Sequence, residues 1–272
     1  MSLWGDGEVR FVLVSDLDHT MVDHDDPQDE SLRSFNTLWS SSFAKDSLLI
    51  FSTGRSPALF EELKGAHPLL VPNLLVCSVG TEIFHFHEGQ SKEDERWARI
   101  LDEGWDRSAA LEVALQFGSA LAPQVDSEQR PHKISFHVNV ESREEQAELV
   151  EKLGLGLTEV GLKAKIIFSG GKDLDIIPIA AGKGKALEFI LGQLREEGRY
   201  PKDGVQVNGD SGNDIEMFEV DGVRSCVVSN AHTEVREWCD AHKTPSIFQA
   251  TKRCAAGIME ALEYFGSEAQ DH

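Results

Sequence analysis

Cysteine is scarce in this chain and shows no metal-ligand spacing. The 272 residues contain four cysteines and no Cys-x-x-Cys pair, which argues against a disulfide framework and against a structural zinc site. Cys77 and Cys226 lie within apolar runs, where a thiol behaves as a small hydrophobic group. We therefore expect buried, reduced cysteines.

Long apolar runs are also absent. No stretch approaches the roughly 18 consecutive apolar residues that a transmembrane helix requires. Residues 1–6 lack a basic segment followed by a hydrophobic one, which is the pattern of a secretory signal. The sequence therefore favours a soluble, cytoplasmic protein with no membrane partner.

Basic residues are few relative to acidic ones. The chain has 26 lysines and arginines against 47 aspartates and glutamates, a formal net charge of -21. Nucleic acids and anionic membranes are bound by basic surfaces, so this balance argues against both as partners. An anionic substrate would be repelled at long range, so basic residues close to a site are informative.

The sequence does contain an apolar run, from Val12, that indicates a buried strand ending at Asp16 and Asp18. Residues two apart in a strand point to the same side, so the two carboxylates would converge and repel. Mg²⁺ is bound by one or two carboxylates together with substrate phosphate oxygens. Ligands of open α/β sheets bind at the carboxyl ends of the strands. An acidic turn without a ligand explains this pair alone equally well.

Three later segments each lie where a predicted strand ends or a predicted helix begins. They are Ser-Thr-Gly-Arg-Ser at 52–56, Gly-Lys-Gly-Lys at 182–185 and Gly-Asp-Ser-Gly-Asn-Asp at 209–214. Together with Asp-x-Asp-x-Thr at 16–20, they resemble the four motifs of the haloacid-dehalogenase superfamily of aspartyl phosphotransferases. Four motifs in the family's order make this resemblance specific.

Longer phrases are similar to those of the sucrose-phosphate phosphatase family of plants and related phototrophs. These phrases lie at 14–24, 51–57, 78–82, 128–133, 167–175 and 209–214. The resemblance runs from about residue 11 to about residue 265. It implies a Mg²⁺-dependent phosphatase that hydrolyses sucrose 6-phosphate, the last step of sucrose synthesis. Association with sucrose-phosphate synthase stays open.

The resemblance implies a role for each matched residue of the first three motifs. Asp16 is the expected nucleophile, forming an aspartyl phosphate, and Asp18 is the expected general acid/base. Thr53 and the backbone of Gly54 are expected to bind the phosphate. Lys183 is expected to neutralise both the nucleophile and the transferred phosphoryl group. Either aspartate could instead be a metal ligand only, and the Thr53 segment could be a simple turn with a helix cap.

The resemblance also implies the magnesium ligands. Asp16, Asp18, Asp210 and Asp214 form the expected set, with Asp18 contributing its backbone carbonyl and Asp210 binding directly. Asp214 is expected to bind through water or to orient other groups, and Asn213 to contact the substrate phosphate. A calcium-loop interpretation fails because the ligand spacing of an EF-hand is missing.

Alternating strand and helix patterns predict an α/β fold with a Rossmann-like, doubly wound parallel sheet. The pattern changes in the middle of the chain, where a helical stretch from 101 to 117 is followed by several strands and a further helix. We expect a catalytic core formed by residues 1–88 and 179–272. Residues 89–178 are expected to form an inserted α+β cap that selects the substrate.

Sugar recognition is expected to come mostly from the cap. Charged side chains can exchange hydrogen bonds with sugar hydroxyls, so Lys133, Lys172 and Asp173 are candidate contacts, joined by Glu82 from the core. Each is explained almost as well as a surface residue at a hairpin end.

Two other functions stay open. One is a cap-containing phosphatase for another sugar phosphate. The other is a non-catalytic phosphosugar-binding partner of sucrose-phosphate synthase. The second would be expected to lose the nucleophile, whereas this chain keeps Asp16, Asp18, Lys183 and Asp210.

Overall fold

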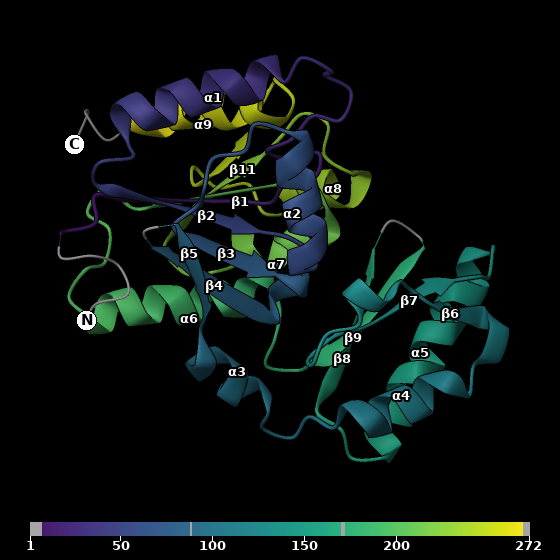
Figure 1. Cartoon of the computed structure of the whole chain (residues 1–272). Helices are drawn as coiled ribbons and strands as arrows, with labels where there is room; N and C mark the ends of the chain where they lie inside the picture. Colours follow the sequence, from purple (N-terminus) through teal and green to yellow (C-terminus); the bar gives the residue numbers. More distant parts are fainter. Residues whose placement is uncertain (1–6, 88, 170–171, 269–272) are drawn as a thin grey trace.

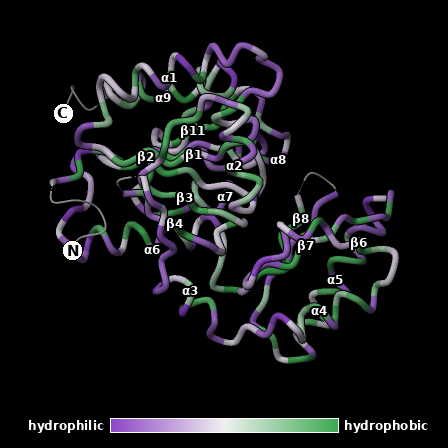
Figure 2. The backbone as a smooth tube through the Cα atoms, viewed as in Figure 1, coloured by the Kyte–Doolittle hydropathy of each residue, from purple (hydrophilic) through white to green (hydrophobic). Residues whose placement is uncertain are grey.

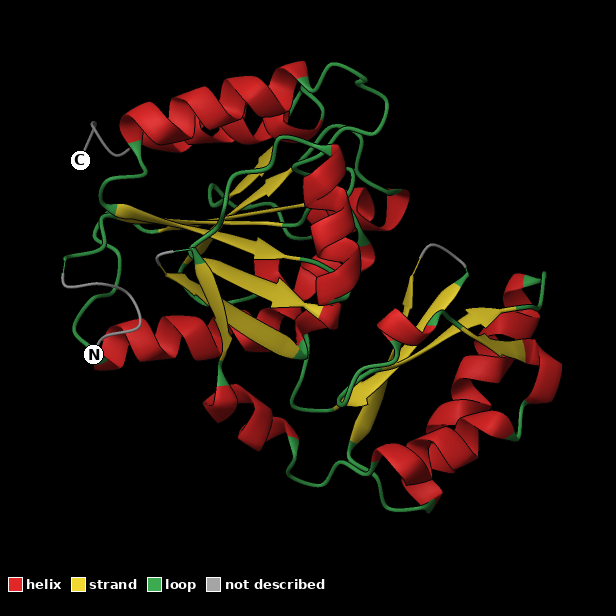
Figure 3. Ribbon diagram, viewed as in Figure 1, coloured by secondary structure: helices red, strands yellow, loops and turns green. Residues whose placement is uncertain are grey.

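The computed structural model describes residues 7–87, 89–169 and 172–268. Its core is an eight-stranded sheet in the order β12 (Ile247–Gln249), β11 (Val223–Val227), β10 (Val205–Gly209), β1 (Phe11–Ser15), β2 (Ser47–Ser52), β3 (Leu74–Cys77), β4 (Glu82–His87) and β5 (Gln90–Glu93). Neighbouring strands from β12 to β3 are parallel, and β4 and β5 add an antiparallel edge. The predicted parallel α/β core is confirmed (Figure 3).

Helices cover both faces of this sheet, as parallel strands require. Val12 and Val14 of β1 belong to one apolar cluster, whereas Phe11 and Leu13 belong to another, because successive side chains alternate between faces. The first face is covered by α3 (Glu95–Leu101), α6 (Lys183–Glu196), α7 (Ile215–Phe218) and α8 (Thr233–Ala241). The second is covered by α1 (Glu30–Ser42), α2 (Pro57–Ala66) and α9 (Cys254–Glu268). Hydrophobic segments concentrate along the central strands between these layers (Figure 2).

The middle of the chain forms a separate unit, with one layer of strands and one layer of helices. Its antiparallel sheet has the order β6 (Leu121–Pro123), β7 (Ile134–Val138), β9 (Asp173–Pro178) and β8 (Ala164–Ser169). The helices α4 (Arg107–Leu115) and α5 (Arg143–Glu159) pack on it through an apolar cluster that includes Phe136 and Leu153. This α+β unit, the cap, lies beside the core (Figure 1).

Short 3₁₀ helices in the described residues shape several connections. They are η1 (Ser78–Gly80), η2 (Gly118–Ala120), η3 (Asp126–Glu128) and η4 (Gly212–Asp214). Two of them, η3 in the cap and η4 after β10, belong to segments that line the cavity described below.

Two expectations about the cap need correction. Of the predicted helical stretch from 101 to 117, only α4 (Arg107–Leu115) is an α-helix, because α3 already ends at Leu101, the chain turns at Gly104, which has a φ of +77°, and Asp106 caps α4. The cap also begins later than residue 89. β5 pairs with β4 in the core sheet, and Trp97 of α3 packs in the core.

The cysteines are buried and free, as predicted. None of the helices in the described part of the chain combines the length and hydropathy that a membrane span needs.

Candidate active site

Three parallel strands bring the predicted motif residues to one edge of the core sheet. β1 pairs with β10 on one side and with β2 on the other. Asp16 follows β1, Thr53 follows β2 and Asp210 follows β10. The backbone N–H of Asp16 donates a 3.0 Å hydrogen bond to the carbonyl of Asn208. Residues far apart in the sequence are therefore neighbours at the carboxyl ends of the strands.

Lys183, the first residue of α6, contacts two of the carboxylates. Its Nζ donates hydrogen bonds to Oδ1 of Asp16 at 2.6 Å and to Oδ1 of Asp214 at 2.7 Å, and its side chain is 1% exposed. Burial lowers the pKa of this ammonium, but the charges of Asp16 and Asp214 outweigh burial and hold the pKa above its ordinary value. Lys183 is therefore a fixed positive charge in the site.

A glycine allows the start of α6 to reach this position. Gly80, with a φ of +84°, lies against Gly182, and a Cβ at Gly80 would sit 2.2 Å from the carbonyl carbon of Gly182. No real side chain tolerates that distance, so any larger residue at position 80 would displace the backbone that carries Lys183.

Asp16, Asp210 and Asp214 form a buried carboxylate group. Each offers an oxygen that lies within 4.8 Å of the others. Thr20 donates a 2.8 Å hydrogen bond to Oδ1 of Asp210. Oδ2 of Asp214 accepts from the backbone N–H groups of Asp210 and Ser211, each at 3.0 Å. These contacts fix the direction of the carboxylates.

Burial and mutual repulsion act on the pKa values of this group. Burial raises the pKa of Asp16 well above its usual range, Lys183 opposes the rise, and Asp214 and Asp210 add to it. Burial, followed by the charge of Asp214, raises the pKa of Asp210 to about 6, although the hydrogen bond from Thr20 acts in the opposite direction. Burial and repulsion thus make it unfavourable for all three carboxylates to be ionised together.

The carboxylate group fits a small divalent cation. Three carboxylates face the single ammonium of Lys183, so part of their negative charge is uncompensated. Carboxylate oxygens are the hard ligands that Mg²⁺ prefers. A cation here would favour the ionised carboxylates and relieve the repulsion that raises the pKa of Asp210. Asp16, Asp210 and Asp214 are the residues that could hold it.

The carboxylate of Asp18 lies apart from this group. Its Oδ2 accepts from Nε of Arg55 at 2.7 Å and its Oδ1 accepts from Nη2 of Arg55 at 2.7 Å. Nε2 of His24 lies 2.7 Å from the same Oδ1. Burial alone raises the pKa of Asp18, but Arg55, and after it His24, hold the pKa below its ordinary value. The predicted metal contact through the backbone carbonyl of Asp18 stays a prediction.

The turn after β2 is held by its own hydrogen bonds. The N–H of Thr53 donates to the carbonyl of Val76 at 2.8 Å, and its hydroxyl accepts from the N–H of Arg55 at 3.1 Å. Ser56 caps α2 by accepting from the N–H of Leu59. Thr53 and the adjacent Gly54 are therefore fixed before any ligand binds.

A cavity of about 510 Å³ lies over these groups, between the core and the cap. On the core side it is lined by Asp16, Asp18, Thr53, Gly54, Asp210 and Asn213. On the cap side it is lined by Gln124, Glu128, Lys133, Asp173 and Asp175. The predicted motif residues and polar cap side chains thus share one space.

A buried lysine organises the cap side. Nζ of Lys133 donates to Oε2 of Glu128 at 2.7 Å and lies 3.5 Å from Oδ1 of Asp175. Oε1 of Glu128 accepts from the backbone N–H of Ser56 at 3.1 Å. The cap segment that carries Glu128 therefore contacts the core at the start of α2.

The four predicted sugar contacts have different positions. Lys133 and Asp173 line the cavity, whereas Lys172 is exposed and is not part of its described lining. Glu82 is also outside that lining. It is buried, and Nη2 of Arg130, in the cap, donates to its Oε1 at 2.6 Å. Glu82 thus joins the core to the cap.

Several residues of the cavity were not predicted from the sequence. No role was expected for Arg55, although Arg55 binds Asp18. Glu128 and Asp175 lie in phrases that carried the family resemblance, so a signal existed for both. Gln124, which donates to Oδ1 of Asp173 at 3.0 Å, lies outside every motif.

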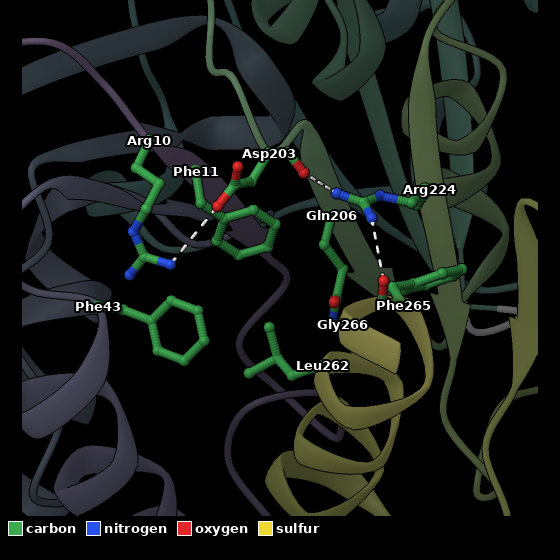
Figure 4. Close-up of a pocket in the computed structure, with 9 residues that line it drawn as sticks. All are labelled: Arg10, Phe11, Phe43, Asp203, Gln206, Arg224, Leu262, Phe265 and Gly266. Atoms are coloured by element: carbon green, nitrogen blue, oxygen red, sulfur yellow. Dashed lines mark hydrogen bonds and ion pairs between the residues drawn. The ribbon is translucent and has the colours of Figure 1, made fainter. Parts of the chain in front are cut away.

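A second cavity, of about 320 Å³, lies at the opposite edge of the sheet, where Arg10 precedes β1 (Figure 4). The guanidinium carbon of Arg10 is 5.2 Å from the ring centre of Phe43, and that of Arg224 is 5.4 Å from the ring centre of Phe265. None of the motif carboxylates lines this cavity, so it is separate from the candidate active site.

Comparison with known proteins finds a family model and relatives that agree with one another. A family model described as Sucrose-6F-phosphate phosphohydrolase matches residues 9–266. The chain is 45% identical over 259 residues to sucrose-phosphatase 1 of Nicotiana tabacum, covering 94% of this chain and 59% of that protein. It is 30% identical over 262 residues to mannosylfructose-phosphate phosphatase of Agrobacterium fabrum, covering 94% of this chain and 96% of that protein. The chain spans about three fifths of the length of the plant sucrose-phosphatases that it matches.

A solved structure is similar as well. The crystal structure of the sucrose-phosphatase of Synechocystis, in complex with sucrose and phosphate, superposes with a TM-score of 0.81 at 33% identity, covering 95% of this chain and 98% of that one. Fold, motif geometry and sequence thus agree. The chain belongs to the sucrose-6F-phosphate phosphohydrolase family.

Proposed function

We propose that this protein is a Mg²⁺-dependent phosphatase that hydrolyses sucrose 6-phosphate to sucrose and phosphate through an aspartyl-phosphate intermediate. The observation that carries the proposal is the contact of Lys183 with Asp16 at the floor of a cavity whose opposite wall is the polar cap. A buried nucleophile beside a fixed positive charge suits an anionic phosphoryl group, and the cap side chains suit a sugar.

In the first half-reaction, a carboxylate oxygen of Asp16 attacks phosphorus. The bond between phosphorus and the sugar oxygen breaks, and its electron pair stays on the sugar oxygen. Asp18 lines the same cavity. Because Arg55 and His24 hold its pKa below its ordinary value in the free protein, Asp18 must take up a proton with the substrate before it passes that proton to the sugar oxygen. Lys183 and the Thr53 turn offset the charge on the phosphoryl oxygens.

In the second half-reaction, water attacks the phosphorus of the aspartyl phosphate. Asp18 takes the proton of the water as the new phosphorus–oxygen bond forms. The bond to Asp16 breaks, which restores the carboxylate and releases phosphate. One residue thus serves as acid and then as base, returning to its starting state after each turnover.

Asp16, Asp210 and Asp214 would hold magnesium in this proposal, with a backbone contribution from Asp18. When bound, magnesium supplies positive charge that screens the approach of a carboxylate to a phosphate. Lys183 alone offers one positive charge against three carboxylates, which supports a need for the cation.

The proposal also specifies sucrose as the sugar of the substrate. It is supported by the plant sucrose-phosphatases and by the Synechocystis enzyme that binds sucrose and phosphate. The relative from Agrobacterium, a mannosylfructose-phosphate phosphatase, keeps another sugar phosphate open as a second candidate. Association with sucrose-phosphate synthase also stays a prediction.

A panel of phosphate esters tests the proposal. Phosphate release with magnesium should be fastest for sucrose 6-phosphate, slower for mannosylfructose phosphate and for fructose 6-phosphate, and absent after chelation. Asp16→Asn should abolish turnover while the protein stays folded. Turnover in that variant would contradict the mechanism, and preference for another ester would redirect the substrate assignment alone.

A further inference from the structure

The segment after β1 folds back on itself and returns to Asp18. The backbone N–H groups of Met21 and Val22 both donate to the carbonyl of Leu17, at 2.9 and 2.8 Å. This tight turn brings His24 beside Asp18, where Nε2 of His24 lies 2.7 Å from Oδ1 of the carboxylate. A residue six positions along the chain is thereby placed directly against the proposed general acid/base.

The ring of His24 contacts two other rings. Its centre lies 5.0 Å from that of His19 and 5.6 Å from that of His67, with interplanar angles of 68° and 80°. The His67 ring is itself fixed, because its Nδ1 lies 2.7 Å from Oδ1 of Asp29. Edge-to-face packing of this kind restricts rotation of the central ring. The hydrogen bond to Asp18 therefore comes from an immobilised group.

His24 contacts Asp18 but is not part of the cavity lining, whereas Asp18 and Arg55 are. Arg55 reaches both carboxylate oxygens from the β2–α2 turn, and His24 contacts Oδ1. The two hydrogen bonds from the guanidinium of Arg55 keep it coplanar with the carboxylate of Asp18. The two groups can still move together, because the arginine side chain is flexible. A second contact, from a rigid ring on another segment, removes that freedom.

We infer that His24 is a positioning residue that holds the Asp18 carboxylate in the orientation for proton transfer. The inference rests on the proposed function, in which Asp18 protonates the sugar oxygen and then activates water. Proton transfer requires hydrogen-bond reach of the reacting oxygen, and a displacement of about 1 Å can cost on the order of a hundredfold in rate.

Substitution of His24 should change kcat more than KM. We expect His24→Ala to lower kcat for sucrose 6-phosphate roughly ten- to a hundredfold with a nearly unchanged KM. His24→Gln, whose side-chain amide can again donate to Asp18, should recover most of the loss. His242→Ala is the matched control, because the His242 side chain is exposed just after α8, where its Nδ1 lies 2.8 Å from the carbonyl of Trp238 and its ring stacks on the Trp238 ring.

An ester with a good leaving group separates positioning from mere structural support. p-Nitrophenolate leaves without protonation, so the first half-reaction with p-nitrophenyl phosphate does not need a correctly placed Asp18, whereas attack by water still does. In rapid-mixing experiments His24→Ala should therefore keep a full first-turnover burst of p-nitrophenolate and then turn over slowly. With sucrose 6-phosphate the first turnover should itself be slow.

The outcomes are distinct. A kcat of His24→Ala near that of the unmodified protein with sucrose 6-phosphate would overturn the inference. A kcat that falls only in proportion to the folded fraction would also overturn it, because His24 would then support only the fold. Failure of the unmodified protein to release phosphate from any ester would instead refute the proposed function, and the inference with it.

Discussion

Nζ of Lys183 lies 2.6 Å from Oδ1 of Asp16, although 167 residues separate the two in sequence. The whole cap is inserted between them. The two halves of the core must therefore assemble across the insertion before the site exists, and the cap is carried directly over that site. The charge and burial of this pair lead to several measurable expectations.

Substitution of Lys183 should strongly lower both activity and stability. Lys183→Met leaves Asp16 and Asp214 without their ammonium partner, so kcat should fall at least about a hundredfold, as when a preorganised charge-stabilising donor is removed. Stability should also fall, by roughly 3 kcal/mol or more, because breaking a buried ion pair leaves unpaired charge. Phosphate release and urea unfolding measure the two effects.

Lys185→Met is the control for that variant. Lys185 is 54% exposed and pairs with Glu188 on the surface of α6, so both activity and stability should stay close to those of the unmodified protein. Equal losses in the two variants would mean that general charge, and not the contact with Asp16, is what matters.

Metal-free protein should lose stability as the pH rises. The pKa of Asp210 is raised from 3.8 to about 6 in the folded state, so folding favours its protonated form. This contribution is fully present below about pH 4 and is lost as the pH passes through about 6, a change on the order of 2 to 3 kcal/mol. Urea unfolding of chelated protein between pH 4 and 7 measures it.

Magnesium should reverse that trend, since it binds the ionised carboxylates. Asp210→Asn should reduce the slope in the metal-free protein without abolishing it, because the pKa of Asp16 is raised as well, and at pH 7 the variant should be at least as stable as the unmodified chain. A chelated Asp210→Asn variant that keeps the full slope would show that other groups titrate in this range.

In the cap, Lys133 should matter and Lys172 should not. Lys133→Met removes a cavity-lining charge and leaves Glu128 and Asp175 unpaired, so kcat/KM for sucrose 6-phosphate should fall at least about tenfold. Lys172 is exposed and outside the described cavity lining, so Lys172→Met should change kcat/KM less than about twofold. The reverse order would restore Lys172 as a sugar contact.

The ion pair of Arg130 with Glu82 should affect large substrates only. Arg130→Met loosens the cap segment between Glu128 and Lys133, so KM for sucrose 6-phosphate should rise several-fold, on the order of 1 kcal/mol of lost binding. The kinetic constants for p-nitrophenyl phosphate, which has no sugar to place, should stay nearly constant. Arg99→Met, an exposed residue of α3, is the control. A parallel loss with both esters would indicate damage to the core.

The sequence predicts the convergence of Asp16, Thr53 and Asp210, because parallel strands present their carboxyl ends at one edge. It does not predict the pairing of Asp18 with Arg55 and His24, since that depends on side-chain directions across two turns. The position of Glu82 was missed for a similar reason. Its partner Arg130 comes from the cap, and the docking of two separate layers has no periodic signature in sequence.

The identity of the nucleophile is the claim on which the rest depends. Acid quench during steady turnover, followed by borohydride reduction, converts an aspartyl phosphate to homoserine, which peptide mass spectrometry can locate. The proposed mechanism predicts homoserine at position 16 and at no other aspartate. Homoserine at another position, or none while the enzyme turns over with a burst of p-nitrophenolate, would contradict it.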